Sequence, residues 1–164
     1  MDLTEWPLES ITHDRQIARA IVFDEQGYFY FLKAERDDDF GNVTVIETAG
    51  GGVEPGETLE EAIQRELIEE LGACVEIIRK IGVVSDYYNF IHRHNMNHYF
   101  LCRVQSIGPT QLTSNEKNHL HLSTLKLSYN EAIQMYEASR DSRLGRLLYN
   151  REMPVLKSVK GIFA

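Results

Sequence analysis

Few features of this sequence point to secretion, a membrane or nucleic acid. Its 164 residues include only two cysteines, Cys74 and Cys102, too few for a disulfide framework, and we expect both to be buried as small hydrophobic residues. The first ten residues, MDLTEWPLES, contain neither a basic region nor an apolar core, so we expect no signal peptide. No apolar run approaches the roughly 20 residues that a membrane span needs. The expected location is therefore the cytoplasm, and we expect no membrane partner.

Positive charge is also scarce. Lysine and arginine number 17 against 25 acidic residues, which gives a formal net charge of -8. Proteins that bind duplex nucleic acid gain affinity from Lys and Arg on phosphates, so a duplex partner is not expected. Hydrophobic residues make up 43% of the chain and charged residues 26%, as in an ordinary globular protein. We expect a single domain over residues 1–164.

Hydrophobic patterning predicts a mixed α/β architecture in which helices pack on a mixed β-sheet. Gly50, Gly51 and Gly52 are expected to end the third strand, and residues 85–97 to form a polar, aromatic loop. The predicted strands span residues 16–23, 28–33, 43–48, 75–84 and 98–104. The predicted C-terminal helices span residues 130–139 and 142–149.

The clearest helix lies between Thr58 and Gly72. Thr58 is a good N-cap, and Glu61 three residues later predicts a capping box. Gly72 stands where a helix C-terminus favours glycine. About thirteen residues without a helix breaker separate the two signals.

The glutamates of this helix lie where an ordinary surface helix would not have them. On a helical wheel with Glu66 at zero, Glu69 falls near -60° and Glu70 near +40°, at about 100° per residue. The apolar residues of the helix cover about -40° to +140° on the same wheel, so the acidic patch overlaps the apolar arc. Repulsion between Glu66 and Glu70 costs about 0.2–0.5 kcal/mol, and the helix dipole disfavours anions in the last turn.

Repeated breaks of local rules at one place suggest a functional site. A divalent cation would relieve the repulsion, and hard carboxylate oxygens suit Mg²⁺ or Mn²⁺. On the helix alone, a metal site and an acidic surface patch remain alternatives. The preceding glycines favour the metal site, because they let backbone groups approach a ligand closely.

Residues 51–73 read GGVEPGETLEEAIQRELIEELGA. This segment resembles the Nudix box, G-x5-E-x7-R-E-U-x-E-E-x-G-U, in which U is a bulky apolar residue. Ala73 is smaller than the usual last aliphatic, and the other fixed positions match. The resemblance implies a Nudix-type α/β/α sandwich with a mixed β-sheet. It also implies a MutT-like, metal-dependent pyrophosphohydrolase that cleaves a small-molecule nucleoside diphosphate linked to another moiety.

The resemblance also implies roles for individual residues. Glu66 and Glu70 would bind Mg²⁺, or Mn²⁺ in its place, with help from Glu69 and from the backbone carbonyl of Gly50. Arg65 would hold the glutamates in place through ion pairs with Glu57 and Glu69. The residues expected to take part in catalysis are Glu57, Arg65, Glu66, Glu69 and Glu116.

The resemblance leaves the general base open between a box glutamate and one on a later loop. The best-placed later candidate is Glu116, in the predicted loop SNEKNH over residues 114–119. An ordinary surface glutamate is the alternative for Glu116. Aromatic and cationic groups can stack a base and hold a phosphate. The expected substrate contacts are therefore the glycines Gly51 and Gly52, whose backbone can approach a ligand closely, and the loop residues Tyr87, Tyr88 and Arg93. A variable surface loop is the alternative for the last three.

Two other functions exist for this type of fold. A prenyl-diphosphate isomerase needs a cysteine and a glutamate facing the substrate, and neither cysteine is convincingly placed for this. A non-catalytic nucleotide-sensing module commonly has an eroded box, whereas this box is nearly complete. The substrate stays open among nucleotide sugars, ADP-ribose, dinucleoside polyphosphates and nucleoside triphosphates, and a homodimer is compatible with the resemblance.

Overall fold

The structure is a computed structural model that describes residues 2–4, 13–38, 41–88, 93–118 and 121–163. Its strands are β1 (Asp2–Thr4), β2 (His13–Phe23), β3 (Phe29–Asp38), β4 (Gly41–Glu47), β5 (Ala49–Gly52), β6 (Ala73–Tyr88), β7 (Arg93–Ile107) and β8 (Ser123–Leu127). Its α-helices are α1 (Leu59–Leu71), α2 (Ser114–Asn118), α3 (Tyr129–Ala138) and α4 (Arg143–Ser158), and 3-10 turns follow α3 (Ser139–Asp141) and α4 (Lys160–Phe163).

Within the described residues the strands form one eight-stranded mixed sheet in the order β1-β6-β7-β2-β3-β4. The short strand β5 pairs with β2, and β8 pairs with β3. β2 runs parallel to β7 along its whole length, while β6 and β7 form a long antiparallel pair. The expected mixed sheet is confirmed, and its parallel centre brings chain segments together that are far apart in sequence.

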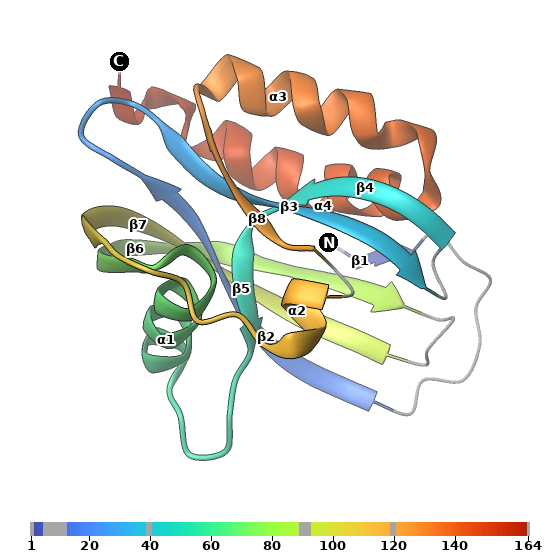
Figure 1. The fold of residues 1–164 in the computed structure, drawn as a ribbon, viewed down its shortest axis with the longest axis horizontal. Coiled ribbons are helices and arrows are strands. Elements are labelled where there is room, and N and C mark those ends of the chain that lie inside the picture. The colour runs from blue at the N-terminus through green and yellow to red at the C-terminus, as the bar shows by residue number, and fades with distance from the viewer. Residues whose placement is uncertain (1, 5–12, 39–40, 89–92, 119–120, 164) are drawn as a thin grey trace.

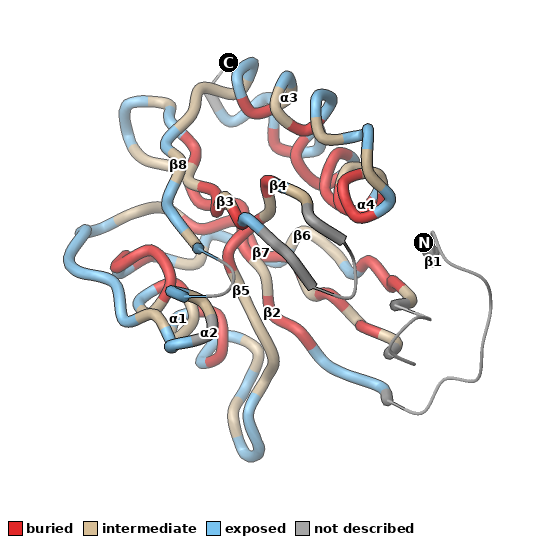
Figure 2. Tube along the Cα trace, turned by 45° about the vertical axis from the view of Figure 1, so that its right-hand side comes forward, coloured by how far each residue is buried: buried red, intermediate tan, exposed pale blue. Residues whose placement is uncertain are grey.

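Helices cover both faces of the sheet, which makes the fold an α/β/α sandwich (Figure 1). Side chains alternate between the faces along each strand. Ala18 and Ala20 of β2 pack in the core under α1, whereas Ile21 packs in the core under α3 and α4. In Figure 2 the buried segments lie along the sheet and on the inner sides of these helices. The glutamates of α1 therefore belong to the face of the sheet that this helix covers.

The ends of α1 are those predicted. The Thr58 hydroxyl accepts a hydrogen bond from the Glu61 amide at 3.1 Å, and Gly72 takes a left-handed conformation with φ of 65°. The next chain segment packs closely on this end, because the Gly108 amide donates to the Gly72 carbonyl at 2.7 Å. Both ends of the helix that carries the glutamates are therefore fixed.

Two loop predictions are wrong. Gly50, Gly51 and Gly52 do not end a strand: they lie in β5, hydrogen-bonded to β2, after a break at Thr48. Within the predicted loop over residues 85–97, residues 85–88 continue β6 and residues 93–97 continue β7. In both places partners distant in the sequence supply the pairing, which local composition does not reveal.

The C-terminal part is also more regular than expected. The sequence does not predict β8, because this strand, STLKL, is short and most of its residues are exposed. The last helix starts after Ser142 as predicted but continues to Ser158, through Pro154. Pro154 is exposed, and the apolar inner side of α4 holds the helix on the sheet.

The two cysteines differ. Cys102 is buried under α1, as expected, and burial raises the pKa of its thiol to about 12. Cys74 is exposed at the start of β6, contrary to the expectation that both cysteines are buried. None of the helices in the described residues has the length and apolar character required to cross a membrane.

The Gly72 end of α1 should tolerate no side chain. A Cβ there would lie 2.0 Å from the Gly108 carbonyl oxygen, whereas one at Gly27, which also has a positive φ, would meet nothing within 4 Å. We expect Gly27→Ala to cost about 1–2 kcal/mol from backbone strain alone. Gly72→Ala should cost at least about 1 kcal/mol more because of the clash. Urea unfolding of both variants measures the difference, and equal losses would contradict the packing described for Gly72.

Candidate functional site

The inner side of α1 presses glutamates against β5. Glu70 is only 6% exposed, and its Oε1 accepts a hydrogen bond from the Gly50 amide at 2.8 Å. Glu66 is half-buried one turn earlier, over Gly51. A Cβ at Gly51 would lie 2.5 Å from Glu66 Oε1, so only glycine lets this carboxylate lie directly on the strand. The overlap of acidic and apolar positions seen on the wheel is therefore real.

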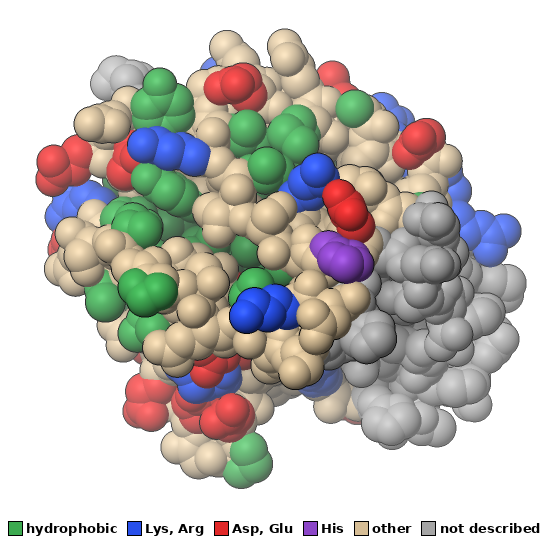
Figure 3. Space-filling view, viewed as in Figure 1, with side chains coloured by type: hydrophobic (Ala, Val, Ile, Leu, Met, Phe, Trp, Pro, Cys, Tyr) green, Lys and Arg blue, Asp and Glu red, His purple; other side chains and the backbone are tan. Residues whose placement is uncertain are grey.

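Arg65 ties this arrangement together. Its Nε and Nη2 donate to the two carboxylate oxygens of Glu57 at 2.8 and 2.9 Å. Nη2 also donates to the Gly52 carbonyl at 3.0 Å. Nη1 donates to Glu66 Oε1 at 2.8 Å and, more weakly, to Glu69 Oε2 at 3.4 Å. One guanidinium thus joins the loop before α1, the end of β5 and the helix itself, and acidic side chains crowd around this part of the surface (Figure 3).

The carboxylates differ in their electrostatics. The hydrogen bonds from Arg65 lower the pKa of Glu57 to about 2. Burial raises the pKa of Glu66, with the charges of Glu69 and Glu116 adding to the effect and Arg65 opposing it. Burial also raises the pKa of Glu70 well above its ordinary value, although the Gly50 amide stabilises its charged form. Burial therefore outweighs the stabilisation that Arg65 gives to charged Glu66 and that the Gly50 amide gives to charged Glu70.

The donor set fits a hard divalent cation. Glu66, Glu69 and Glu70 supply carboxylate oxygens, and Gly50, whose amide contacts Glu70, carries a backbone carbonyl of the kind that such cations also bind. The hydrogen bonds described above use Oε1 of Glu66 and Oε1 of Glu70, so Oε2 of each can still accept a ligand. Among the described residues no three Asp, Glu, His or Cys side chains already converge on one point. The oxygens thus line α1 without forming a finished cage.

Glu116 lies in the short helix α2, where the sequence predicted a loop. Its Oε1 accepts a hydrogen bond from the Thr113 amide at 2.9 Å, and its own amide donates to the Thr113 hydroxyl. The Gln111 amide donates to the Glu69 carbonyl at 2.7 Å, which docks this segment on the end of α1. The negative charge of Glu116 acts on both Glu66 and Glu70. The structure therefore brings Glu116 close to the box glutamates.

The predicted aromatic contacts lie further across the sheet. Tyr87 stands in β6, which β7 and β2 separate from β5. Its ring stacks on His94, with centroids 4.4 Å apart and an angle of 11° between the planes. The side chains of Tyr88 and Arg93, at the adjoining ends of β6 and β7, lie outside the described part of the structure.

Sequence reasoning missed the residues that hold the start of β5 from the face of the sheet that carries α4. Glu152 of α4 is fully buried and accepts a hydrogen bond from the Thr48 amide at 2.7 Å. Arg19 of β2 donates to the Thr48 carbonyl at 3.1 Å. A signal was present in the sequence, because Arg151 and Glu152 interrupt the apolar side of the last helix just as the box glutamates interrupt that of α1.

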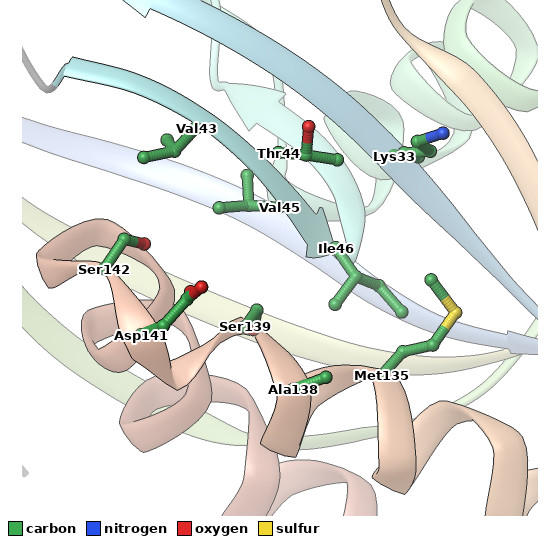
Figure 4. Close-up of a pocket in the computed structure, with 10 residues that line it drawn as sticks. All are labelled: Lys33, Val43, Thr44, Val45, Ile46, Met135, Ala138, Ser139, Asp141 and Ser142. Carbon is green, nitrogen blue, oxygen red and sulfur yellow. The ribbon is translucent and has the colours of Figure 1, made fainter.

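The described residues also enclose a cavity of about 540 Å³ between β4 and the α3–α4 connection. Figure 4 shows Val43, Val45 and Ile46 on one side of it and Met135 and Ala138 on the other. None of the glutamates described above lines it. The cavity is therefore separate from the candidate site.

Comparisons with known proteins find matches to both the sequence and the fold. A family model described as the NUDIX domain matches residues 13–143. A solved structure, a NUDIX hydrolase from Nitrosomonas europaea, superimposes with a TM-score of 0.60 over 76% of this chain and 78% of that one. Its sequence identity is 18%, so this likeness shows the fold alone.

Two curated proteins are similar over shorter segments. The nucleoside triphosphatase NudI of an Enterobacter species is 66% identical over 29 residues, which are 18% of this chain and 21% of that protein. The 8-oxo-dGTP diphosphatase of Haemophilus influenzae is 40% identical over 57 residues, which are 35% of this chain and 40% of that protein. The matches thus span at most 40% of the length of either relative.

The Arg65–Glu57 pair should make the folding stability depend on pH in the acid range. The pKa of Glu57 is about 2 in the folded chain, below the value of about 4.3 expected when unfolded. Its stabilisation is therefore complete above that unfolded value and is lost as the pH falls toward 2. We expect Glu57→Gln to lower Tm at pH 6, with the gap to the parent closing between about pH 4.5 and pH 2. Glu60→Gln, at an exposed site on α1, should show a small and constant gap. A gap for Glu57→Gln that does not vary with pH would contradict the pairing.

Proposed function

The chain belongs to the NUDIX family, and on that premise we propose that it is a metal-dependent pyrophosphohydrolase. It cleaves the phosphoric anhydride bond of a nucleoside diphosphate linked to another moiety. The observation that carries this proposal is the burial of Glu70 of α1 against β5, next to half-buried Glu66 of the same helix. Two carboxylates held in this way, with raised pKa values, suit the binding of a cation that a diphosphate also needs.

Glu66, Glu69 and Glu70, with the Gly50 carbonyl, are the residues that would hold Mg²⁺ or Mn²⁺. When bound, such an ion offsets the charge of the diphosphate and lowers the pKa of a bound water. Arg65 keeps Glu66 and Glu69 in place through the contacts described above. Its positive charge is shared among glutamates, so we assign it a positioning role.

Glu116 is our candidate for the group that takes the proton from the attacking water. Its segment is docked on the end of α1, and its charge acts on Glu66 and Glu70, which supports a role for this carboxylate beside the proposed metal ligands. A carboxylate of this kind can serve as a general base.

Nucleoside triphosphates, ordinary or oxidised, are the substrates to test first, because both curated relatives are named for activity on nucleoside triphosphates. Gly51 and Gly52 would approach the phosphates, while Tyr87, Tyr88 and Arg93 would contact the base or its sugar. The stacked Tyr87–His94 pair supports a contact with a base at this end of the sheet. We propose a cytoplasmic protein, with the homodimer as its assembly to test.

An isomerase mechanism gains no support from the cysteines. Cys102 is buried in the core, with a pKa of about 12, so it is poorly suited to exchange a proton with a substrate. Cys74 is exposed at the start of β6, and no contact between it and the glutamates is described. The intact Arg65 network likewise favours catalysis over a module that only senses nucleotides.

Removing the charge of Glu70 should abolish most of the activity. Glu70→Gln keeps the shape of the side chain and an oxygen for the Gly50 amide, but it weakens cation binding. We expect turnover with Mg²⁺ to fall about a hundredfold or more. Phosphate release from a panel of nucleotides, coupled to product identification, measures this loss, and Mn²⁺ titration followed by electron paramagnetic resonance measures binding.

Glu60→Gln is the matched control, since it makes the same change at an exposed position of the same helix and should leave both readouts unchanged. Wild-type turnover in Glu70→Gln would overturn the proposed ligand role.

Glu116 should matter for the rate and little for the metal. If it is the base, Glu116→Gln lowers turnover at least about tenfold. The affinity for Mn²⁺ should change little, because Glu116 is not among the proposed ligands. Unaltered turnover would remove Glu116 from the mechanism and leave the base among the box glutamates.

A further inference from the structure

The interior between the sheet and α4 contains a charged cluster that the proposed reaction does not use. Arg151 and Glu152 lie on the inner side of α4, and both are fully buried. Arg151 Nη1 donates to Asp86 of β6 at 2.8 Å, and Asp86 is buried as well. Buried charges are expensive to desolvate, and a cluster of this kind calls for an explanation.

Glu152 makes its main contacts with the junction between β4 and β5. Its Oε1 accepts from the Thr48 amide at 2.7 Å, and its Oε2 accepts from the Thr48 hydroxyl at 2.9 Å. The hydroxyl groups of Tyr99 and Tyr136 also donate to this carboxylate. Although burial alone would raise the pKa of Glu152, the charges of Arg151 and Arg19, together with the Thr48 amide, lower it below its ordinary value. Glu152 thus accepts two hydrogen bonds from Thr48 and one from each tyrosine.

Thr48 is also held through its backbone carbonyl. Arg19 Nη1 donates to the Thr48 carbonyl at 3.1 Å, and Arg19 Nε donates to Asn97 Oδ1 at 3.0 Å, which fixes the guanidinium. The backbone amide of Thr48 therefore binds an anion, and its carbonyl binds a cation. Charge-assisted hydrogen bonds are about twice as strong as neutral ones. This is an unusually firm attachment for the single residue that separates β4 from β5.

The two residues that contact the glutamates follow directly. Gly50, two residues beyond Thr48, donates its amide to Glu70, and Gly51 lies under Glu66. A shift of the Thr48 peptide would move both contacts together, because β5 is short and begins at the next residue. The position of the glutamates relative to β5 thus depends on a carboxylate from the far side of the sheet.

We propose that Glu152 is a positioning residue: by holding Thr48 from α4, it fixes β5 so that the Gly50 amide and the Gly51 backbone meet Glu70 and Glu66. The consequence for catalysis rests on the proposed function, whereas the consequence for Gly50 does not. A purely structural role would lower global stability and speed exchange of the core amides alike, so the positioning role is judged by Gly50 exchange relative to the core amides of β7.

Glu152→Gln tests this directly. The side-chain oxygen can keep the Thr48 amide, but its bond loses the negative charge, and the new NH₂ group faces the Thr48 and Tyr99 hydroxyls. Without metal or nucleotide, we expect Gly50 amide exchange, followed by NMR, to become about tenfold faster relative to the core amides of β7, in line with the loss of charge assistance. With metal and nucleotide, kcat should fall about tenfold, with KM within about twofold of the parent.

Tyr136→Phe is the matched control. It removes a hydroxyl that contacts the same carboxylate at 3.3 Å and leaves both Thr48 contacts in place. It should change neither Gly50 exchange nor kcat, whatever it does to Tm. A folded Glu152→Gln protein with parental Gly50 exchange relative to the β7 core amides would overturn the proposal, and so would equal acceleration of this exchange in the control.

If Glu152→Gln does not fold, Thr48→Val decides, because it deletes only the hydroxyl contact. Faster Gly50 exchange in Thr48→Val supports the proposal, and parental exchange overturns it. If the parent chain hydrolyses no nucleotide while Glu152→Gln still speeds Gly50 exchange, the positioning role stands and the proposed function fails.

Discussion

The guanidinium of Arg65 is the interaction on which the site depends. It binds Glu57 through two hydrogen bonds and also reaches the Gly52 carbonyl and Glu66. Without it, Glu66 and Glu69 would lose the guanidinium that they contact, at a place where burial already penalises the charge of Glu66. The contacts to Glu57 and Gly52 also anchor the loop and the strand. Arg65 therefore sets both the charge balance and the geometry of the glutamates.

A second set of charges acts on the same strand from the opposite side of the sheet. Glu152 and Arg19 hold the amide and the carbonyl of Thr48, as Arg65 holds the carbonyl of Gly52. Thr48 and Gly52 bracket the strand β5. The strand is thus fixed at both ends by ionised side chains, and its middle is left to face α1. Rigid support of this kind is what a preorganised site requires.

The sequence predicts the local half of this arrangement. The ends of α1 at Thr58 and Gly72, and the placement of Glu66 and Glu70 on its apolar side, follow from helix geometry alone, because 3.6 residues per turn fixes which side chains share a face. The pairing of Arg65 with Glu57 follows from the Nudix resemblance. The strand character of residues 49–52 and the contact of Glu152 with Thr48, 104 positions apart, depend on non-local pairing that local patterns do not encode.

The three glycines show how such a pattern misleads. They suggested a strand end because glycine commonly serves in turns. In the structure each replaces a side chain that would strike a neighbour: the Ala18 carbonyl beside Gly50, the Glu66 carboxylate beside Gly51 and the Arg15 guanidinium beside Gly52. Because successive positions of a strand face opposite sides, side chains here would be blocked on both faces. The glycines therefore serve close approach rather than turning, which lets β5, paired with β2, offer bare backbone to the glutamates.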